Sequence, residues 1–236
     1  MKPKAWSFSS LSDFHTCPKA YYHKRIAKDV DDPPNDAGLA GDFVHKAFEA
    51  YLQHGTPLPS TYPDNIRDWP EGIKPPAFYQ PYLDRIAAIP GKLLAEQEYA
   101  INRKFEPVAM DAEDVWCRCI IDILILQGRR AKVIDHKTGK RKMDKRQLKL
   151  CALLVFIYHP EVDEVVTGYA WLKDRKMDRE TYKREDEAEL WQEFMRDLVP
   201  YKQAFKHEVF VARPSGLCNG WCPVTSCDHW KPKRRR

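Results

Sequence analysis

Two acidic residues and a lysine lie near the middle of the chain, in segments whose composition favours β-strands. Asp122 lies within the apolar run VWCRCIIDILIL, and Asp135 and Lys137 lie in AKVIDHKTGK. Burial of a lone carboxylate is costly unless a cation or hydrogen bonds compensate, so Asp122 requires a partner. Side chains alternate along a strand, which places Asp135 and Lys137 on one face. Pairing through the short turn at 127–129 would bring Asp122 beside them.

Two carboxylates beside an ammonium group suit the hydrolysis of a phosphodiester. The carboxylates would hold Mg²⁺ or Mn²⁺, which polarises the phosphate and lowers the pKa of a bound water. Lys137 would orient that water or neutralise developing charge. The alternative is an ordinary surface ion pair between Asp135 and Lys137 at a strand end, because the Asp-x-Lys spacing is short and common.

Two further polar residues accompany this trio. His45 follows Gly41 by one turn of a predicted helix, on the same face, so the glycine leaves room beside the imidazole for another segment or a ligand. Gln147 begins an apolar helix directly after the Asp135 strand and its loop. A single histidine on a helix is usually only a polar residue, and its significance here comes from the residues around it.

The motifs GDFVH, IID, IDHKTGK and QLKLC, in this order, resemble the RecB-like branch of the PD-(D/E)XK nucleases. That branch includes CRISPR-associated exonucleases and many phage recombination exonucleases. The resemblance covers nearly the whole chain. It implies that His45, Asp122 and Asp135 ligate the metals, that Lys137 is catalytic, and that the main chain of His136 contacts a metal.

The same resemblance assigns two more residues and shows three departures. Glu98 matches an acidic residue on the first core strand, and Gln147 matches the start of a Q-x-x-x-Y motif associated with positioning DNA. Ile121 replaces the proline that names the superfamily, Cys119 stands where glycine is frequent, and Cys151 replaces the tyrosine of the motif. The loss of the tyrosine bears on how the substrate is held, and not on the metal chemistry.

Three cysteines lie within ten residues of one another near the C-terminus, in LCNGWCPVTSCDHW. Three thiols so close together indicate a metal site, which requires a fourth ligand: Cys17 or His229. Members of the RecB-like branch that carry an iron–sulfur cluster place one cysteine before the nuclease core and three after it. The resemblance therefore implies a structural [4Fe–4S] cluster on four cysteines: Cys17, Cys218, Cys222 and Cys227. Zinc with His229 as the fourth ligand is the alternative, and the absence of any metal is a third.

The hydrophobic patterns predict an α/β fold with a mixed central sheet flanked by helices, a restriction-endonuclease-like core whose N- and C-terminal segments the cluster joins. We predict helices at 39–52, 82–94, 148–158 and 190–205, and strands at 98–105, 115–126, 131–137 and 165–172. The chain would form a single nuclease domain over 1–236. Its parts would be a motif helix at 39–53, a proline-rich and helical insertion at 54–96, a catalytic core at 97–172 and the cysteine segment at 216–230.

The charge of the chain permits a polyanionic partner without requiring one. The formal net charge is +5, and the basic residues are unevenly distributed. One run directly follows the catalytic strand, and we predict that it contacts DNA, although a solvated loop would have the same composition: Lys140, Arg141, Lys142, Lys145 and Arg146. The terminal KPKRRR would be a phosphate-contacting arm or a disordered end.

No apolar stretch is long enough to span a membrane, and the N-terminus lacks the pattern of a signal peptide, so a cytoplasmic protein is expected. We therefore predict a DNA nuclease that uses Mg²⁺ or Mn²⁺, an exonuclease in preference to an endonuclease, acting on single strands or duplex ends. Its setting would be recombination, repair, or phage or CRISPR DNA processing, with a protein partner from such a system. The alternatives are a non-catalytic, metal-stabilised DNA-binding module and an RNA-directed or structure-specific endonuclease.

Overall fold

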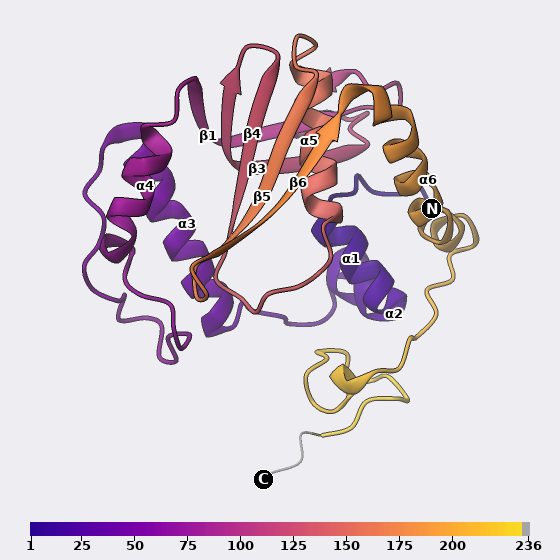
Figure 1. The fold of residues 1–236 in the computed structure, drawn as a ribbon. Helices are drawn as coiled ribbons and strands as arrows, with labels where there is room; N and C mark the ends of the chain where they lie inside the picture. Colours follow the sequence, from indigo (N-terminus) through magenta and orange to yellow (C-terminus); the bar gives the residue numbers. More distant parts are fainter. Residues whose placement is uncertain (233–236) are drawn as a thin grey trace. The chain divides into compact units, whose positions relative to one another are not determined.

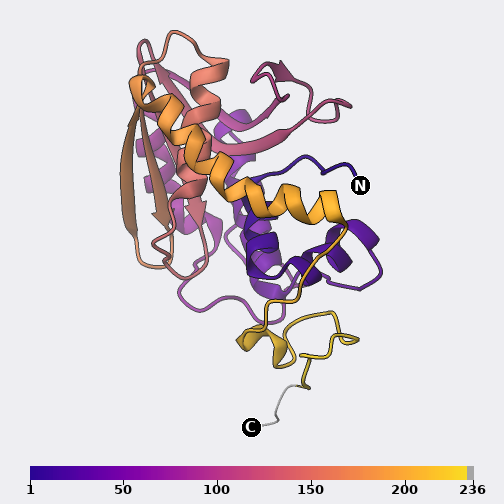
Figure 2. The ribbon, with the colours of Figure 1, turned by 90° about the vertical axis from the view of Figure 1, so that its right-hand side faces the viewer.

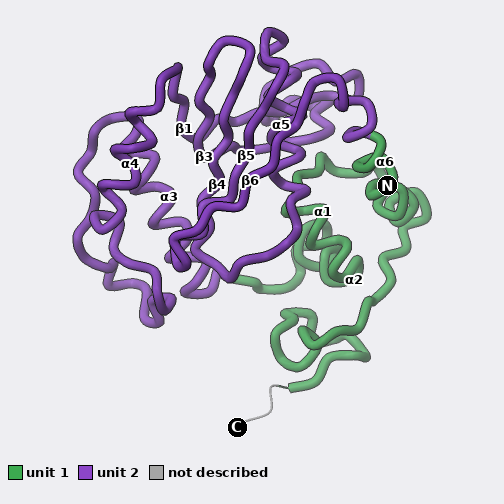
Figure 3. The backbone as a smooth tube through the Cα atoms, in the orientation of Figure 1, with its two compact units in different colours: residues 1–33, 192–236 green, residues 34–191 purple. Residues whose placement is uncertain are grey.

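The structure is a computed structural model that describes residues 1–232, and it divides into two compact units (Figure 3). One unit is continuous, Pro34–Trp191, and the other combines Met1–Pro33 with the chain from Gln192 onward. The basic end that begins at Lys231 lies mostly outside the described residues. Each unit is described separately.

The continuous unit is built on a six-stranded mixed sheet (Figure 1). Its strands are β1 (Lys92–Ile101), β2 (Pro107–Val108), β3 (Cys117–Gln127), β4 (Arg130–Lys137), β5 (Glu164–Trp171) and β6 (Lys176–Lys183). The strand order is β2-β1-β3-β4-β5-β6, and only the β4–β5 pair is parallel. This sheet confirms the predicted mixed α/β fold.

Helices cover both faces of the sheet in this unit (Figure 2). Helix α5 (Arg146–Tyr158) connects the parallel strands β4 and β5, and its residues from Leu150 to Phe156 are all buried. Helices α3 (Asp36–His54) and α4 (Gln80–Ala87) pack on the other face, where Val44, Phe48 and Leu83 form a core with the β3 residues Ile123 and Ile125. Burial on two faces explains why β3 and α5 are apolar on nearly all sides.

Two features of the sheet differ from the sequence-based prediction. Strand β1 begins at Lys92, inside the segment assigned to a helix and before the predicted core boundary at 97. Strand β6 was not predicted. It is an edge strand of sequence KMDRETYK in which only Tyr182 is buried, so it lacks the apolar alternation that identifies a strand.

The second unit gathers the two ends of the chain. It contains α1 (Phe8–Thr16), α2 (Pro18–Tyr21), a π-helix (Tyr22–Ala27) and the part of α6 (Glu187–His207) that follows residue 191. Aromatic residues form its core, and the hydroxyls of Tyr21 and Tyr201 are 2.9 Å apart. Residues 180 positions apart therefore pack together within this unit.

The start of α1 differs slightly from the prediction. Ser7 is the N-cap, and its side chain and that of Ser10 form a capping box with each other's backbone N–H groups. None of the helices within residues 1–232 has the length and apolar character that a membrane crossing requires.

Candidate active site

Three potential metal ligands from three different elements meet at one end of the sheet. His45 comes from α3, Glu96 from β1 and Asp122 from β3, and one ligand atom of each lies within 4.8 Å of the other two. Glu96 lies opposite Asp122 in the β1–β3 register, between the pairs Ala95↔Ile123 and Gln97↔Ile121.

The strands β3 and β4 separate where their acidic residues begin. Their pairing runs from Gln127↔Arg130 to Ile123↔Ile134, so Asp122 and Asp135 would form the next pair. The Asp122 carboxylate instead accepts the backbone N–H of His136, at 2.7 Å. The sheet therefore opens between the two carboxylates, and polar groups occupy the gap.

Asp135, Lys137 and Gln147 form a connected group beside this opening. Lys137 Nζ lies 2.6 Å from Asp135 Oδ2 and donates to Gln147 Oε1 at 3.0 Å, while Gln147 Nε2 donates to Asp135 Oδ1 at 2.5 Å. Gln147 lies in the first turn of α5, so the crossover helix holds both the acid and the lysine in place. The structure thus brings together the three residues that the sequence pattern grouped, with Gln147.

His45 connects the helix α3 to both acidic strands. Its Nε2 lies 3.0 Å from the carbonyl oxygen of His136, and its Nδ1 lies 3.3 Å from Asp122 Oδ2. Burial opposes protonation of the imidazole, but the hydrogen bond and charge of Asp122, with the charge of Asp135, raise its pKa to about 9. An added Cβ at Gly41 would lie 3.1 Å from Thr138 Oγ1, so the segment for which this glycine leaves room is the loop after β4.

The three carboxylates have unequal pKa values because their surroundings differ. Burial and the charge of Asp122 raise the pKa of Asp135 to about 6, although Lys137 opposes this shift. Burial and Asp122 likewise raise the pKa of Glu96 to about 7. Burial opposes the ionisation of Asp122 too, but the hydrogen bond and charge of His45 lower its pKa below the usual range. Asp122 is therefore the anionic centre of the site.

The donor set fits a hard divalent cation. Asp135 Oδ2 is buried and forms no well-aligned hydrogen bond within residues 1–232, despite the nearby Lys137 ammonium group. The raised pKa values of Asp135 and Glu96 show that the negative charge here exceeds what the neighbouring cations neutralise. Carboxylate and carbonyl oxygens with one imidazole are ligands suited to Mg²⁺ or Mn²⁺.

Glu96 was missed from the sequence, and Glu98 was assigned in its place. The two residues lie on the same strand, but Glu98 is exposed and pairs with Ile120, two positions along the strand from Asp122. That offset corresponds to about 6.6 Å along a strand. No sequence signal identifies Glu96, because the register between β1 and β3 is not set by a short turn.

Most of the basic run after β4 is engaged with acidic side chains. Arg141 pairs with Asp178, Lys145 with Glu180, and Arg146 with Asp144. Lys140 and Lys142 are exposed. The run lies near the site, as the sequence suggested, but three of its five cations already have protein partners.

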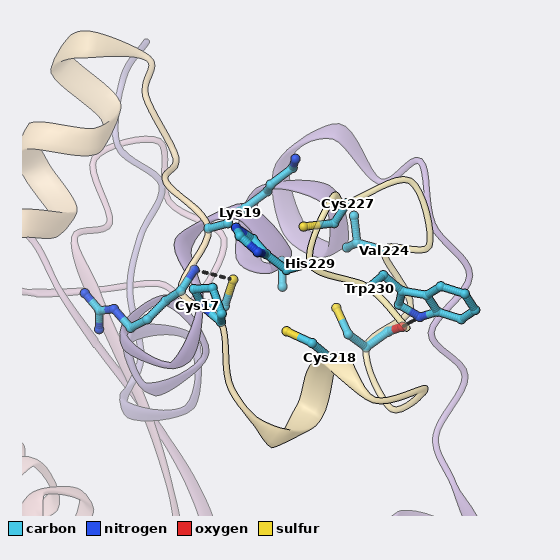
Figure 4. Close-up of a pocket in the computed structure, with 12 residues that line it drawn as sticks. Cys17, Lys19, Cys218, Val224, Cys227, His229 and Trp230 are labelled. Atoms are coloured by element: carbon cyan, nitrogen blue, oxygen red, sulfur yellow. Dashed lines mark hydrogen bonds between the residues drawn. The ribbon is translucent and has the colours of Figure 1, made fainter. Parts of the chain in front are cut away.

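In the other unit, the four cysteines assigned to a cluster line one pocket together with His229 (Figure 4). Cys17 lies at the α1–α2 junction, and its sulfur accepts the Arg213 N–H at 3.4 Å. Burial and the neighbouring sulfurs of Cys17, Cys218 and Cys227 raise the pKa of the Cys222 thiol, although a backbone hydrogen bond opposes this shift. The remaining cysteines are buried, as predicted: Cys117, Cys119 and Cys151.

The sequence matches the model of the PD-(D/E)XK nuclease superfamily over residues 5–227, nearly its whole length. The chain therefore belongs to the PD-(D/E)XK nuclease superfamily, and its class is that of a nuclease. Nucleases of this superfamily use divalent metal ions, which agrees with the donor set described above.

Two solved structures similar to the chain were also found. One is a suspected exonuclease from Eubacterium rectale, with 14% identity, a TM-score of 0.49, and coverage of 95% of this chain and 86% of that one. The other is a protein designated SSO0001, with 12% identity, a TM-score of 0.45, and coverage of 97% and 87%. A search of curated proteins found no match.

Proposed function

We propose that this protein is a divalent-metal-dependent deoxyribonuclease of the RecB-like branch and that it acts as an exonuclease. The observation that carries this proposal is the meeting of His45, Glu96 and Asp122 within 4.8 Å, at the point where the Asp122 and Asp135 strands separate. A plain ion pair between Asp135 and Lys137 would not account for a histidine and two further carboxylates in the same place.

Each residue has a distinct role in this proposal. Asp122, Asp135, Glu96 and His45 would bind the cation, with the carbonyl oxygen of His136 as a further ligand. A bound Mg²⁺ or Mn²⁺ polarises the scissile phosphate and lowers the pKa of a water molecule. Imidazole among the donors favours Mn²⁺ over Mg²⁺.

Lys137 and Gln147 would act on the substrate and on the geometry of the site. The Lys137 ammonium group would orient the attacking water or neutralise charge that develops on the phosphate. Gln147 contacts both Lys137 and Asp135, so its role is to position them. The exposed members of the basic run, Lys140 and Lys142, would contact the DNA backbone beside the site.

The proposed exonuclease activity is tested by the form of the substrate. End-labelled linear DNA, single-stranded and duplex, should release labelled mononucleotides or short products with Mn²⁺ present and none with EDTA. A covalently closed circle of the same sequence should stay intact. Cleavage of the circle at a comparable rate would identify an endonuclease, and no cleavage of any form would indicate a non-catalytic DNA-binding module.

We also propose that Cys17, Cys218, Cys222 and Cys227 bind a [4Fe–4S] cluster with a structural role. The four sulfurs line one pocket, and within the described chain no three of its Cys or His ligand atoms come within 4.8 Å of one another. A single tetrahedral zinc would require sulfur–sulfur distances of roughly 3.8 Å, because Zn–S bonds are about 2.3 Å. The wider spacing favours a multi-iron cluster, in which each thiolate binds a different iron.

The metal content separates the cluster from zinc. Protein purified without oxygen should be brown, with iron and sulfide in equal amounts, and His229→Ala should keep both while Cys218→Ser loses them. Colourless protein with stoichiometric zinc that His229→Ala releases would contradict the cluster.

For its biological setting, we propose an intracellular protein that processes DNA in recombination, repair, or phage or CRISPR systems. All seven cysteines lie within the described residues and none of them forms a disulfide there, which agrees with a reducing compartment.

A further inference from the structure

Two adjoining pockets form a groove on the face of the sheet that carries α4. The first is lined by residues of α4, the preceding turn and the β5–β6 hairpin, and the second by α4 and the middle of β4, β5 and β6. They share Tyr82, Arg85 and Met177, so they form one continuous feature. We call this feature the basic groove.

The charge of the basic groove has one sign. Its cationic lining residues come from α4, β4, the hairpin and β6: Arg85, Lys132, Arg175, Lys176 and Arg179. Neither pocket is lined by an aspartate or a glutamate. In contrast to Arg141, Lys145 and Arg146, these five cations form no ion pair within residues 1–232. Their charge is available to a polyanion.

The basic groove also offers aromatic and apolar surface. Phe78 is 47% exposed although it is a large apolar side chain, and the Arg175 guanidinium lies 4.9 Å from the centre of its ring. The floor between the cations is apolar and includes Ile86, Ala170 and Leu172. A duplex would present only phosphates to such a surface, because its bases are stacked inside. A single strand also offers its bases, which stack on aromatic rings.

One residue connects the basic groove to the candidate active site. Tyr82 lines both pockets, and its hydroxyl lies 3.0 Å from His136 Nε2. The backbone of the same histidine donates to Asp122 and lies beside His45 through its carbonyl. The groove therefore begins one side chain away from the proposed metal ligands.

We propose that the basic groove binds a single strand of DNA, with phosphates on its arginines and lysines and a base stacked on Phe78. The proposal rests on the proposed nuclease function and extends it, because it assigns single-stranded DNA as the form of substrate that this protein holds. The groove is separate from the basic run after β4, whose cations are largely paired.

Binding of labelled oligonucleotides in EDTA tests this proposal without any cleavage. The probes are a fluorescent single strand of about 20 nucleotides, which exceeds the site size of a small single-strand-binding domain, and a duplex of the same length. The groove variant is Arg85→Ala/Arg175→Ala/Arg179→Ala. The matched control, Arg103→Ala/Lys104→Ala/Lys206→Ala, removes the same charge from exposed residues outside the groove.

The groove variant should bind the single strand at least tenfold more weakly than the wild type, with unchanged circular dichroism. Its salt dependence should fall by about 2 in log–log slope, because three phosphate contacts contribute about 0.7 each. The control should change the Kd less than about threefold. The proposal is overturned if the groove variant and the control bind the single strand equally, or if only duplex binding is lost.

Substitutions of Phe78 separate stacking from charge. Phe78→Ala should weaken single-strand binding about fivefold to tenfold and Phe78→Trp should restore it, since stacking of one base on an aromatic ring has an effect of this size. Equal binding by both variants would refute the stacking role.

The proposed function can fail independently of the basic groove. If the wild-type protein does not cleave DNA with Mn²⁺, the nuclease proposal fails whatever the binding data show. If it cleaves DNA and the groove variant binds the single strand normally, only the groove assignment fails.

Discussion

The candidate site contains more negative charge than its own side chains neutralise. Three carboxylates, those of Glu96, Asp122 and Asp135, face the Lys137 ammonium group and the His45 imidazole. The protein without metal responds by holding protons, as the raised pKa values of Glu96, Asp135 and His45 show. A divalent cation would replace those protons, which links the chemistry of the site to pH.

Glu96 and Glu98 provide a direct comparison between two carboxylates of one strand. Glu96→Gln should lower the rate of DNA cleavage with Mn²⁺ at least tenfold, because it removes a ligand that lies opposite Asp122. Glu98→Gln should leave the rate unchanged, because its side chain is exposed and outside the cluster of ligands. The measurement is the initial rate on end-labelled DNA, and a larger loss in Glu98→Gln would restore the sequence-based assignment.

Binding of Mn²⁺ should weaken as the pH falls from about 8 to about 6. Glu96 and Asp135, with pKa values of about 7 and about 6, then take up protons that compete with the metal. His45, with a pKa of about 9, releases its proton at higher pH and favours binding further. Titration calorimetry with Mn²⁺ at three pH values tests this, and an affinity independent of pH would contradict it.

The stability of the metal-free protein should change with pH in the opposite direction. All three groups have folded-state pKa values above their ordinary values, so each stabilises the folded state most at low pH and loses that contribution as the pH rises through its folded pKa. The Tm in EDTA should therefore fall by a few degrees between about pH 5 and about pH 9. Glu96→Gln should reduce this dependence, and an unchanged dependence would show that Glu96 does not contribute to it.

At the scale of elements, close packing of α3 against the end of β4 positions the site. A Cβ atom added at Gly41 would lie only 3.1 Å from the Oγ1 atom of Thr138, which follows Lys137 directly. Helix α3 carries His45 one turn further on, so its distance from β4 sets the distance from the imidazole to the acids.

Gly41→Val should therefore slow cleavage at least tenfold by moving α3 away from Thr138. Gly38→Ala is the matched control, since a Cβ there meets its nearest atom at 3.5 Å, and it should raise the stability by about 0.5–1 kcal/mol with unchanged cleavage. Cleavage rates and thermal melts distinguish the two effects. A fully active Gly41→Val protein would show that the approach of α3 is not important for the site.

The sequence predicted those parts of the site whose geometry is set locally. Strands β3 and β4 are joined by a tight turn, so alternation alone placed Asp122, Asp135 and Lys137 together. Glu96 depends on the register between β1 and β3, which are separated by β2 and its loops, and no local pattern specifies that register. Strand β6 is polar because it lies at the sheet edge, so it carried no apolar signal.

At the scale of the whole molecule, the N- and C-terminal segments belong to one compact unit. Backbone and side-chain contacts link Cys17 to Arg213, and Lys19 to Val211, within that unit. The segment that follows has little regular structure, with one short 3₁₀ helix at Gly216–Cys218. Such a segment requires a bound metal or cross-link to remain ordered.

Cys218→Ser should therefore make the cysteine segment the first site of limited trypsin digestion. Ser226→Ala, an exposed change in the same segment, should be digested like the wild type. The continuous unit Pro34–Trp191 should stay resistant in both variants, because its core does not involve the cysteine segment. Equal resistance of the two variants would contradict a structural role for the cluster.

Cleavage of labelled DNA by matched variants of the acidic site tests the central claim most directly. The wild-type protein should degrade the DNA with Mn²⁺ and not with EDTA. Asp122→Asn and Lys137→Ala should each lose at least about a hundredfold in rate, with circular dichroism unchanged, because metal binding and charge neutralisation both contribute to the transition state. Undiminished cleavage by pure Lys137→Ala or Asp122→Asn protein would contradict the assignment of this site as the active site.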